Sequence, residues 1–583
     1  MDRNTSNLTA EHQLTSALDD VLEAVRSKRS FKLEAGAGSG KTHALIIALQ
    51  EVLDNRSSYL DRRDQKIACI TYTNTAKDEI VERLGENDSV FVDTLHGFLW
   101  ELISPYQKVL SRLVLAMEKW QSLIEPGTTS DKIQVKYSLG IRRLTDDVAY
   151  LHHDDIPLLA KEMFKIKRFR ALTTDRYPII FIDEYQDTPK GLIETMLTSM
   201  ADDLRKPVFG FFGDDWQQIY DNTCGTVSDP MLLNISNQAN FRSSRSVVAF
   251  LNRLRPELPQ FPSSEATEGS VLAFHTNGWN GERLKGQWKG QVPHDVSRAA
   301  LRLVLEELSE CWGSGSLADT KVLMLTHTGI ANELGYGSLP SIFKYNDSFA
   351  KKENDVVAFL VDVLEPALAA YRSRQYGKLF DIIGGTKPLI SNKNERTAWS
   401  SLLAHLDDLR STGSVGDIID ILLTQRLFST PDALVRLQRG LTELLDSSGD
   451  QEAQEWPRRI LEYQQFRDVD YSEVVALSNF ISSSTVFSTQ HNVKGDEFSN
   501  VVVVVGRGWS KYDFADMLLS YSNGPGSKSV VKPSFVRSRN LFYVASSRAR
   551  VNLAFLFAQE LSNEVVDLLS AWIGEKRVRS VNF

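Results

Sequence analysis

Short apolar runs rich in branched and aromatic residues recur in the first part of this chain, and each ends in a polar loop. Four of them are FKLEA from 31, KIACITYT from 66, YPIIFIDEYQD from 177 and KPVFGFFGDD from 206. Strands buried on both faces have this near-continuous apolar pattern. Helical patterns such as HALIIALQEVL lie between the runs. The alternation predicts a parallel α/β sheet.

A second series of strand patterns follows, with GSVLAFHT from 269, KVLMLTHT from 321 and FSTQHNVKGDEFSNVVVVVG from 487. Amphipathic helical stretches such as LLAKEMFKIKRFR interrupt both series. We therefore expect an α/β protein with two parallel-sheet domains, each with a mainly helical insertion. The expected boundaries are 1–98 and 171–248 for the first domain, 99–170 for its insertion, 249–364 and 480–583 for the second domain, and 365–479 for its insertion.

Composition narrows the class of protein. The chain has 583 residues, a formal charge of -9 and only three cysteines, Cys69, Cys224 and Cys311. A net negative charge confines any nucleic-acid contact to a local basic region. Three dispersed cysteines fit neither a disulfide framework nor a zinc cluster. The longest apolar run, VVVVV at 501–505, is far shorter than the roughly 18 residues of a membrane span. We expect a cytoplasmic protein without membrane association.

The stretch EAGAGSGKT at 34–42 has the composition of a loop that holds nucleotide phosphates. Its glycines let several backbone N–H groups point at the phosphates, and the following helix adds its positive end. Lys41 would neutralise the phosphates and Thr42 would bind Mg²⁺. Ala35 stands where the strict pattern has glycine. A plain turn between strand and helix is the alternative. The expected ATP-binding residues are Ala35, Gly36, Ala37, Gly38, Ser39, Gly40, Lys41 and Thr42.

Two carboxylates, Asp183 and Glu184, follow the apolar run YPIIFI. They therefore lie at the carboxyl end of a strand, where ligands bind in open α/β sheets. Asp183 would reach Mg²⁺, and Glu184 would align and deprotonate an attacking water. Acidic residues at strand ends are also common as solvated caps, so the pair indicates a catalytic site only in combination with the glycine-rich loop.

DEYQDT at 183–188 resembles motif II of the UvrD/Rep-type superfamily 1A DNA helicases, and further motifs follow in that family's order. They are Gln13 in LTAEHQ, ITYTNTAKDEI at 70–80, DTLHGF at 93–98, GDDWQQIY at 213–220, NFRSS at 240–244, TQHNVKGDEF at 489–498 and LFYVASSRA at 541–549. The resemblance covers nearly the whole chain and implies two RecA-like domains. It extends to compact UvrD-like proteins such as the helicase subunits of Gabija-type antiphage systems.

The resemblance also implies roles around ATP. Gln13 would read adenine, Phe241 would stack on it, Gly495 and Glu497 would lie at the nucleotide with Glu497 near the ribose, Gln217 would sense the γ-phosphate, Arg242 would reach it, and Arg548 would be the arginine finger. Singly, Arg242 and Arg548 would be ordinary surface ion-pair partners. Because Arg548 follows the second strand series, we expect the two sheets to close on ATP and relax after hydrolysis.

The same motifs imply a track for single-stranded DNA. Its contacts would be Tyr72, Thr73, Asn74, Thr94, His96 and Phe98 on the first sheet, with Thr489 and His491 on the second. Aromatic side chains would stack on bases. For Tyr72 and Phe98, packing between sheet and helix is the alternative. After Tyr220 the family usually has an aromatic-Arg-Gly-Ala stretch, but this chain reads DNTCGT, so one stacking residue is missing.

Two further stretches each allow two interpretations. KEMFKIKRFR at 161–170 gathers basic residues around Phe164 and Phe169, either as a DNA-binding patch or as a solvated helix face. HHDD at 152–155 suggests a metal site, but neighbouring residues at a helix start point apart. We expect Asp154 or Asp155 to be the N-cap of a helix instead.

These patterns favour an ATP-dependent translocase or helicase that moves 3′ to 5′ on single-stranded DNA or tailed duplex DNA. The alternative is a DNA-end or nucleotide-sensing ATPase subunit that gates a partner nuclease, as in antiphage defence. A P-loop kinase, the third reading, predicts neither the second sheet nor the late arginine.

Overall fold

The computed structural model describes residues 9–85, 87–124, 129–138, 142–145, 147–313, 316–325, 327–343, 354–383, 392–425, 430–446, 458–482, 486–490, 493–506, 511–522 and 532–583. The chain forms two compact units. Unit 1 comprises Met1–Leu272, Lys511–Leu553 and Asn563–Arg577, and unit 2 comprises Ala273–Ser510, Ala554–Ser562 and Val578–Phe583.

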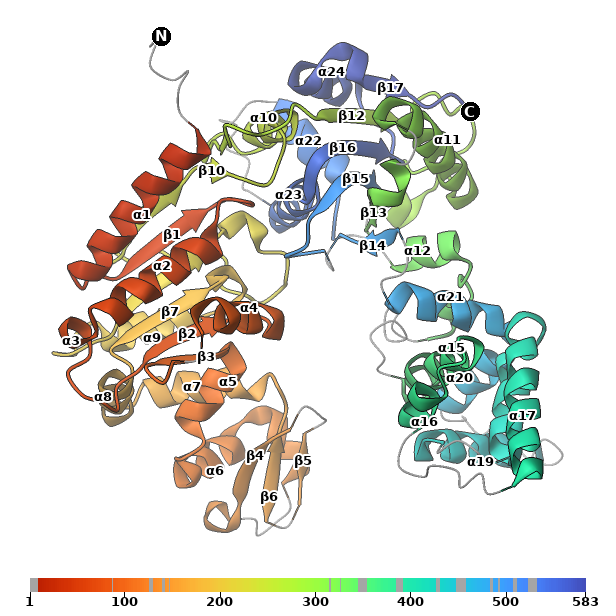
Figure 1. Cartoon of the computed structure of the whole chain (residues 1–583), viewed down its shortest axis with the longest axis horizontal. Helices are drawn as coiled ribbons and strands as arrows, with labels where there is room; N and C mark the ends of the chain where they lie inside the picture. The colour runs from red at the N-terminus through yellow and green to blue at the C-terminus, as the bar shows by residue number, and fades with distance from the viewer. Residues whose placement is uncertain are drawn as a thin grey trace. The chain divides into compact units, whose positions relative to one another are not determined.

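Unit 1 is built on a six-stranded sheet in the order β3-β2-β7-β8-β1-β9 (Figure 1). Its strands are β1 (Phe31–Ala35), β2 (Ile67–Thr71), β3 (Val90–Thr94), β7 (Ile179–Asp183), β8 (Val208–Gly213) and β9 (Leu233–Asn237). All neighbouring strands are parallel. The carboxyl ends of β1, β7 and β8 therefore meet at one edge of the sheet.

Both faces of this sheet are apolar, because successive side chains of a strand alternate between faces. In β2, Ile67 and Cys69 join one buried cluster, whereas Ala68 and Ile70 join the other. Parallel strands covered by helices on both faces require this composition, which is what the apolar runs of the sequence predict. The predicted parallel α/β fold is confirmed here.

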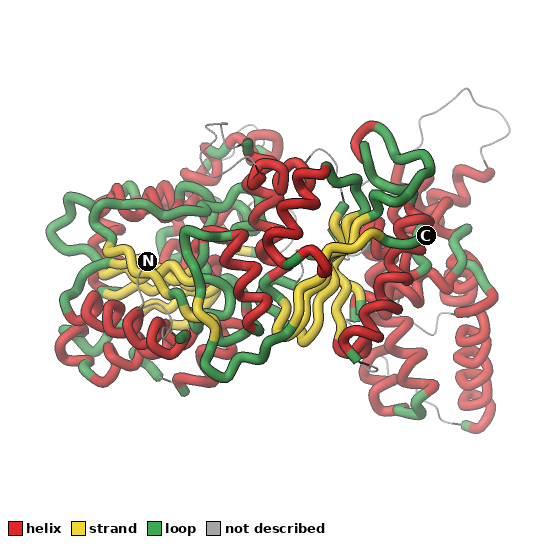
Figure 2. The backbone as a smooth tube through the Cα atoms, turned by 90° about the horizontal axis from the view of Figure 1, so that it is seen from above, coloured by secondary structure: helices red, strands yellow, loops and turns green. Residues whose placement is uncertain are grey.

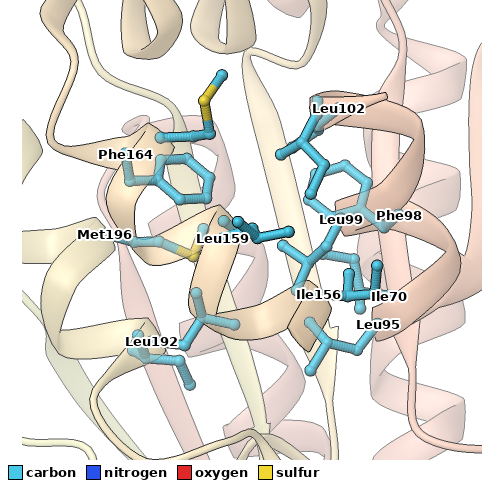
Figure 3. Close-up of a cluster of buried hydrophobic side chains, with 14 of the residues drawn as sticks. Ile70, Leu95, Phe98, Leu99, Leu102, Ile156, Leu159, Phe164, Leu192 and Met196 are labelled. Carbon is cyan, nitrogen blue, oxygen red and sulfur yellow. The ribbon is translucent and has the colours of Figure 1, made fainter. Parts of the chain in front are cut away.

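Helices cover each face. One cluster contains residues from α1 (Ala10–Arg26), α2 (Lys41–Asp54), α3 (Arg56–Tyr59) and α4 (Asn74–Leu84). The other contains residues from α5 (Leu95–Ile103), α6 (Gln107–Ala116), α7 (Asp155–Phe164), α8 (Lys167–Arg176) and α9 (Leu192–Met200). In this second cluster Phe98, Leu159 and Met196 come from three different helices and pack together with Ile70 of the sheet (Figure 3).

A small sheet lies in the first insertion, which the helical patterns alone do not predict. β4 (Gln134–Tyr137) pairs in parallel with β6 (Val148–Leu151), and β5 (Arg143–Leu144) pairs antiparallel with β6. The insertion also contains η2 (Glu118–Leu123) and η3 (Ser130–Lys132). Strands this short show too few alternations to be recognised by period.

The remaining elements of unit 1 come from two stretches of the chain, residues 184–269 and residues 511–577. They are η4 (Tyr185–Asp187), η5 (Asp215–Gln217), β10 (Ala239–Asn240), α10 (Arg245–Leu254), β11 (Phe261–Pro262), α22 (Phe514–Ser522), α23 (Pro533–Ser546), α24 (Asn563–Ile573) and η9 (Glu575–Arg577).

The second large sheet has the order β14-β13-β15-β16-β12-β17. Its strands are β12 (Ser270–His275), β13 (Thr320–Met324), β14 (Phe487–Thr489), β15 (Phe498–Val505), β16 (Ala549–Phe557) and β17 (Val578–Ser580). Consecutive residues Val501–Val503 are fully buried, so β15 is covered on both faces. Figure 2 shows the strands of each large sheet running side by side, in yellow. The predicted second sheet is confirmed.

Helices make up the rest of unit 2. Those before its insertion are η6 (Gly286–Trp288), α11 (His294–Trp312), η7 (Ser316–Asp319), α12 (His327–Leu334) and α13 (Leu339–Ile342). Next along the chain come α14 (Asp355–Phe359) and the π-helix η8 (Leu360–Leu364). The span predicted as the insertion, 365–479, contains α15 (Glu365–Arg372), α16 (Tyr376–Ile383), α17 (Lys393–Thr412), α18 (Val415–Gln425), α19 (Asp432–Asp446), α20 (Arg458–Arg467) and most of α21 (Tyr471–Ile481).

The predicted domain boundaries stay a prediction. The sequence assigns 511–553 and 563–577 to the second domain, whereas these residues form part of unit 1. Among the described residues, none of the helices has both the length and the apolar content needed to cross a membrane.

We predict that Phe98→Ala lowers the free energy of unfolding by about 3–5 kcal/mol, because it empties a buried site. Phe98 is fully buried, with ring centroids 6.1 Å from Phe91 and 5.4 Å from Tyr177. Chemical denaturation followed by tryptophan fluorescence measures the loss. Leu172→Ala is the control, because Leu172 lies exposed on α8, and it should change stability by at most about 0.5 kcal/mol. Equal effects of the two changes would contradict the prediction.

Candidate nucleotide site

The glycine-rich loop connects β1 to α2 and is held in place by side chains at the end of β9 and in β10. Asn237 donates from Nδ2 to the carbonyl of Ser39 at 2.8 Å, and Asn240 donates to that of Ala37 at 3.2 Å. Gly38 and Gly40 have φ of 74° and 83°, a left-handed conformation that favours glycine. The loop is thus a preformed, fixed turn.

Lys41 begins α2, and its ammonium group lies at the carboxyl edge of the sheet. Nζ donates to the Ala35 carbonyl at 3.3 Å and lies 3.9 Å from Oε1 of Glu184. Thr42 follows in the first turn of the helix. The predicted loop, its lysine and the predicted catalytic carboxylate therefore lie together.

Asp183 is the last residue of β7, and its carboxyl group is buried. Burial and the neighbouring Glu184 carboxylate raise the pKa of Asp183 to about 7. Its Oδ1 has no hydrogen-bond partner among the described residues. A buried carboxylate oxygen without a donor fits a divalent cation, which prefers oxygen ligands. Asp183 and Thr42 are the residues that would hold Mg²⁺.

The backbone of Glu184 has φ of 47°, a left-handed conformation that is strained for a residue with a side chain. Its carboxylate accepts a short hydrogen bond from the amide of Gln186. Gln186 is fully buried, and its Oε1 accepts from the backbone N–H of Asp214 at 3.1 Å. Gln186 therefore fixes the direction of Glu184 and connects it to the end of β8.

Gln217 and Arg548 meet, although more than 300 residues separate them in sequence. The Gln217 amide donates from Nε2 to Asp214 at 2.9 Å, and its Oε1 accepts from Nη2 of Arg548 at 3.4 Å. Arg548 precedes β16 and belongs to unit 1. Burial, together with the like charge of Arg242, lowers the pKa of Arg548 to about 9. This guanidinium lies where an anion would stabilise it.

Phe241 and Arg242 lie against the loop. The backbone N–H of Phe241 donates to the Gly38 carbonyl at 2.8 Å, and its ring is 43% exposed. Arg242 donates from Nη1 to the carbonyl of Ser547 at 3.3 Å. Gln13 lies half-buried on α1. The side chain of the next residue, Leu14, lies close to Gly40 of the loop, 3.8 Å from where a Cβ would stand on that glycine. Phe241 and Arg242 therefore lie at the loop, and Gln13 lies on α1, which packs with α2 in one buried cluster.

The predicted nucleotide and DNA residues of the fifth motif lie in unit 2. Thr489 ends β14 and is buried, whereas Gly495, with φ of 96°, and Glu497 are exposed. His491 lies outside the described residues. Burial leaves little of Thr489 for a contact with DNA, and the roles of Gly495 and Glu497 stay predictions.

Most predicted DNA contacts of unit 1 share one edge of the sheet. Tyr72, Thr73 and Asn74 follow β2, and Thr94 and His96 lie at the end of the adjacent β3. The two threonines also begin helices: the Thr73 hydroxyl accepts from the N–H of Ala76 at 3.2 Å, and that of Thr94 accepts from Gly97 at 3.2 Å. Helix capping is therefore one role of these residues.

An exposed aromatic pair lies at this edge. Tyr72 is 41% and Tyr220 37% exposed, and their rings stack with centroids 5.9 Å apart at 25°. Partial burial, followed by the charge of Asp187, raises the pKa of Tyr72 to about 12. Two neighbouring exposed rings form a surface on which a base could stack.

Three aromatic residues do not fit a DNA surface. Phe98 is fully buried, so the packing alternative holds for it. In the basic stretch, Phe164 and Phe169 are buried and pack edge to face at 5.2 Å. Arg170 in this stretch pairs with Asp203 at 2.6 Å. The stretch at 161–170 therefore presents charges from a helix face, and its aromatic residues belong to the core.

The residues of the HHDD stretch at 152–155 contact different partners. Asp154 occupies the N-cap position of α7 but makes no capping hydrogen bond with its side chain. Asp155 is fully buried, receives three bonds from Arg142 at 2.7–3.0 Å, and accepts from the N–H of His152 at 3.0 Å. The His153 ring stacks on His96 with centroids 3.4 Å apart. Asp154 is therefore the N-cap residue of α7, as predicted, although its side chain makes no capping bond, and Arg142 holds Asp155 in an ion pair.

No cluster of three or more His, Cys, Asp or Glu side chains able to hold a metal ion occurs in the part of the chain that the structure describes.

Sequence patterns missed three side chains of this site: Arg255, Trp216 and Tyr543. The Tyr543 hydroxyl accepts from the backbone N–H of Ala37 in the loop at 3.2 Å. Trp216 and Tyr543 lie within stretches that resemble helicase motifs, but the resemblance assigns no role to either side chain. Arg255 follows the apolar face of α10, and nothing in the sequence around it indicates a site.

Comparison with known proteins agrees with this geometry. The family model described as an AAA domain matches residues 20–223. Gabija protein GajB of Bacillus cereus (strain HuB5-5) is 23% identical over 94% of this chain and 96% of that protein. This chain is similar to GajB throughout. Its counterpart from strain VD045 is 26% identical over 40% of this chain and 48% of that protein. The resemblance to UvrD/Rep-like helicases and to the Gabija type is thus confirmed.

We predict that Asp183→Asn stabilises the nucleotide-free protein more at about pH 8 than at about pH 5. A carboxyl whose pKa rises from 3.8 to about 7 on folding contributes stability that is lost as the pH rises through about 7. The asparagine removes that cost only where the aspartate is ionised. Melting temperatures at both pH values test this, with exposed Asp88→Asn as the control. An equal gain at both pH values would show that Asp183 does not titrate in this range.

Proposed function

We propose that this protein is an ATP-dependent DNA motor, a translocase or helicase that moves 3′ to 5′ on single-stranded or tailed duplex DNA. One observation carries the proposal. Beside a phosphate-binding loop, Glu184 pairs with Lys41, and Arg548 donates a hydrogen bond to Gln217. An AAA domain and a GajB-like chain already indicate a helicase-like ATPase. Movement and direction are what the proposal adds.

The side chains divide the work of hydrolysis. Glu184 would accept the proton of the attacking water, and its strained backbone and the Gln186 bond keep it aimed. Lys41, Arg242 and Arg548 would offset the charge that develops on the transferred phosphoryl group. Bound Mg²⁺ would supply further positive charge to the phosphates. Gln13 and Phe241 would hold adenine, and Gly495 with Glu497 would lie at the nucleotide, Glu497 near the ribose.

The carboxyl edge of β2 and β3 would carry DNA. Tyr72 and Tyr220 offer stacked rings, and Thr73, Asn74, Thr94 and His96 offer polar groups for phosphates. We propose that the two RecA-like sheets, divided as the sequence predicts, move relative to each other with each ATP. The Tyr72–Tyr220 pair offers aromatic surface although DNTCGT replaces the usual stacking residue after Tyr220.

The second candidate is an ATPase subunit that senses nucleotide or DNA ends and gates a partner nuclease in antiphage defence in the cytoplasm. Similarity to a Gabija protein along 94% of this chain favours it. Both candidates share one ATP site and differ in what hydrolysis drives.

One set of assays separates the two candidates. ATP hydrolysis by the isolated chain is measured with and without single-stranded DNA, followed by strand separation on a duplex with a 3′ tail and on one with a 5′ tail. DNA-stimulated hydrolysis with separation of the 3′-tailed duplex alone supports the motor. Hydrolysis that begins only when a nuclease partner is added supports the gating subunit.

We predict that Lys41→Ala reduces ATP hydrolysis by more than about 10²-fold, because the loop loses its charge. Release of inorganic phosphate measures the rate. Lys165→Ala is the matched control, since Lys165 is exposed and pairs with Glu162 at the surface. Full turnover in Lys41→Ala would show that the site lies elsewhere.

We predict that Tyr72→Ala weakens binding of an oligothymidine strand by about 1–3 kcal/mol, or about 5- to 150-fold in Kd, because a stacking ring is lost. Fluorescence anisotropy measures the affinity. Tyr376→Ala removes another exposed tyrosine, from the unit 2 insertion, and should leave Kd unchanged. The DNA surface would be misplaced if both variants bound like the unmodified protein.

A further inference from the structure

Arg255 is a buried arginine that follows α10 and ends in the ATP site. Its side chain is 2% exposed, Nη1 donates to Oδ1 of Asp214 at 2.6 Å, and Nη2 donates to Oε1 of Glu34 at 2.5 Å. The guanidinium also lies over the rings of Trp216, at 5.1 Å, and Tyr543, at 5.6 Å. Removing the Arg255 guanidinium and the Asp214 carboxylate from water is costly unless the two groups pair in good geometry. This pairing therefore holds the side chains in a single arrangement.

Asp214 transmits that arrangement to Gln217. Asp214 is fully buried, and while Oδ1 accepts from Arg255 and from the N–H of Trp216, Oδ2 accepts from Nε2 of Gln217 at 2.9 Å. A carboxylate only accepts hydrogen bonds. The Gln217 amide must therefore present its nitrogen to Asp214 and its oxygen to Arg548.

The charge of Arg255 keeps Asp214 in the form that does this. Burial would raise the pKa of Asp214, but Arg255, followed by Lys41, holds it below its ordinary value. A protonated Asp214 could donate to Gln217 and allow the amide to turn over. The nitrogen of Gln217 would then face Arg548, where two donors meet.

We propose that Arg255 is a positioning residue for ATP hydrolysis: by binding Asp214 and Glu34 together, it fixes the orientation of the Gln217 amide at the γ-phosphate. Arg255 acts through Asp214 and does not touch the nucleotide. The inference rests on the proposed function, because Gln217 has a γ-phosphate to read only if the site hydrolyses ATP.

The test is Arg255→Lys, which retains the charge but lacks the two-pronged geometry needed to span Asp214 and Glu34. We expect kcat for DNA-stimulated ATP hydrolysis to fall about 10- to 100-fold, with KM for ATP within about threefold. Arg410→Lys is the control for a damaged buried ion pair, since Arg410 binds Glu365 at 2.6 Å with 12% and 5% exposure. It should leave kcat unchanged. An unchanged kcat in Arg255→Lys, or an equal loss in Arg410→Lys, overturns the inference.

A double variant separates positioning from general damage. If Arg255 acts through Gln217, adding Arg255→Lys to Gln217→Ala should cost less than about threefold more. Losses that multiply would show that the two residues act independently, and would overturn the inference.

An equilibrium measurement removes dependence on turnover. Calorimetric Kd values for ADP and ATPγS give the preference for a γ-phosphate, which Arg255→Lys should reduce about two- to threefold and Arg410→Lys should not. If the unmodified protein binds neither nucleotide, or binds both as well as Lys41→Ala does, the proposed function fails. If it prefers ATPγS in a Lys41-dependent way and Arg255→Lys keeps that preference, only the inference about Arg255 fails.

Discussion

Apolar covering of both faces of the first sheet is the constraint on which unit 1 depends. Because helices bury each face, polar groups of the strands reach solvent or ligand only at strand ends. The ends of β1, β7 and β8 lie side by side, which brings the loop, Asp183 and Asp214 to one edge. The ends of β2 and β3 continue that edge and carry Tyr72 and His96. One packing requirement therefore aligns the nucleotide residues with the candidate DNA surface.

The charges of the site are perturbed in opposite directions, and the pattern has a chemical meaning. Asp183 has a raised pKa because it is buried beside another carboxylate, and Arg548 has a lowered pKa because it is buried beside another guanidinium. A cation would relieve the first and a phosphate anion the second. Asp214 and Arg255, by contrast, offset each other's charge within the protein. The site thus combines a satisfied scaffold with groups poised for a charged ligand.

Aromatic residues of the helicase-like motifs are exposed in one case and buried in the core in another. Tyr72 follows a strand end and stays exposed, whereas Phe98 lies one turn into α5 and packs on Tyr177. Phe164 and Phe169 likewise face the core from α7 and α8. Position relative to the strand end, and not aromatic character, decides which of these rings a base could reach.

Local patterns in the sequence determined the two parallel sheets, the loop at 34–42 and the carboxylates after β7, because apolar runs and glycine spacing act over a few residues. The sequence pattern did not predict the short strands of the first insertion, since β5 has two residues and shows no period. Only the tertiary structure decided that Arg255 binds Asp214, that Tyr543 reaches Ala37, and that Phe98 is core. Each of these contacts joins residues distant in sequence, or depends on which side of a helix faces the sheet, and chain order alone does not specify which side chains packing brings together.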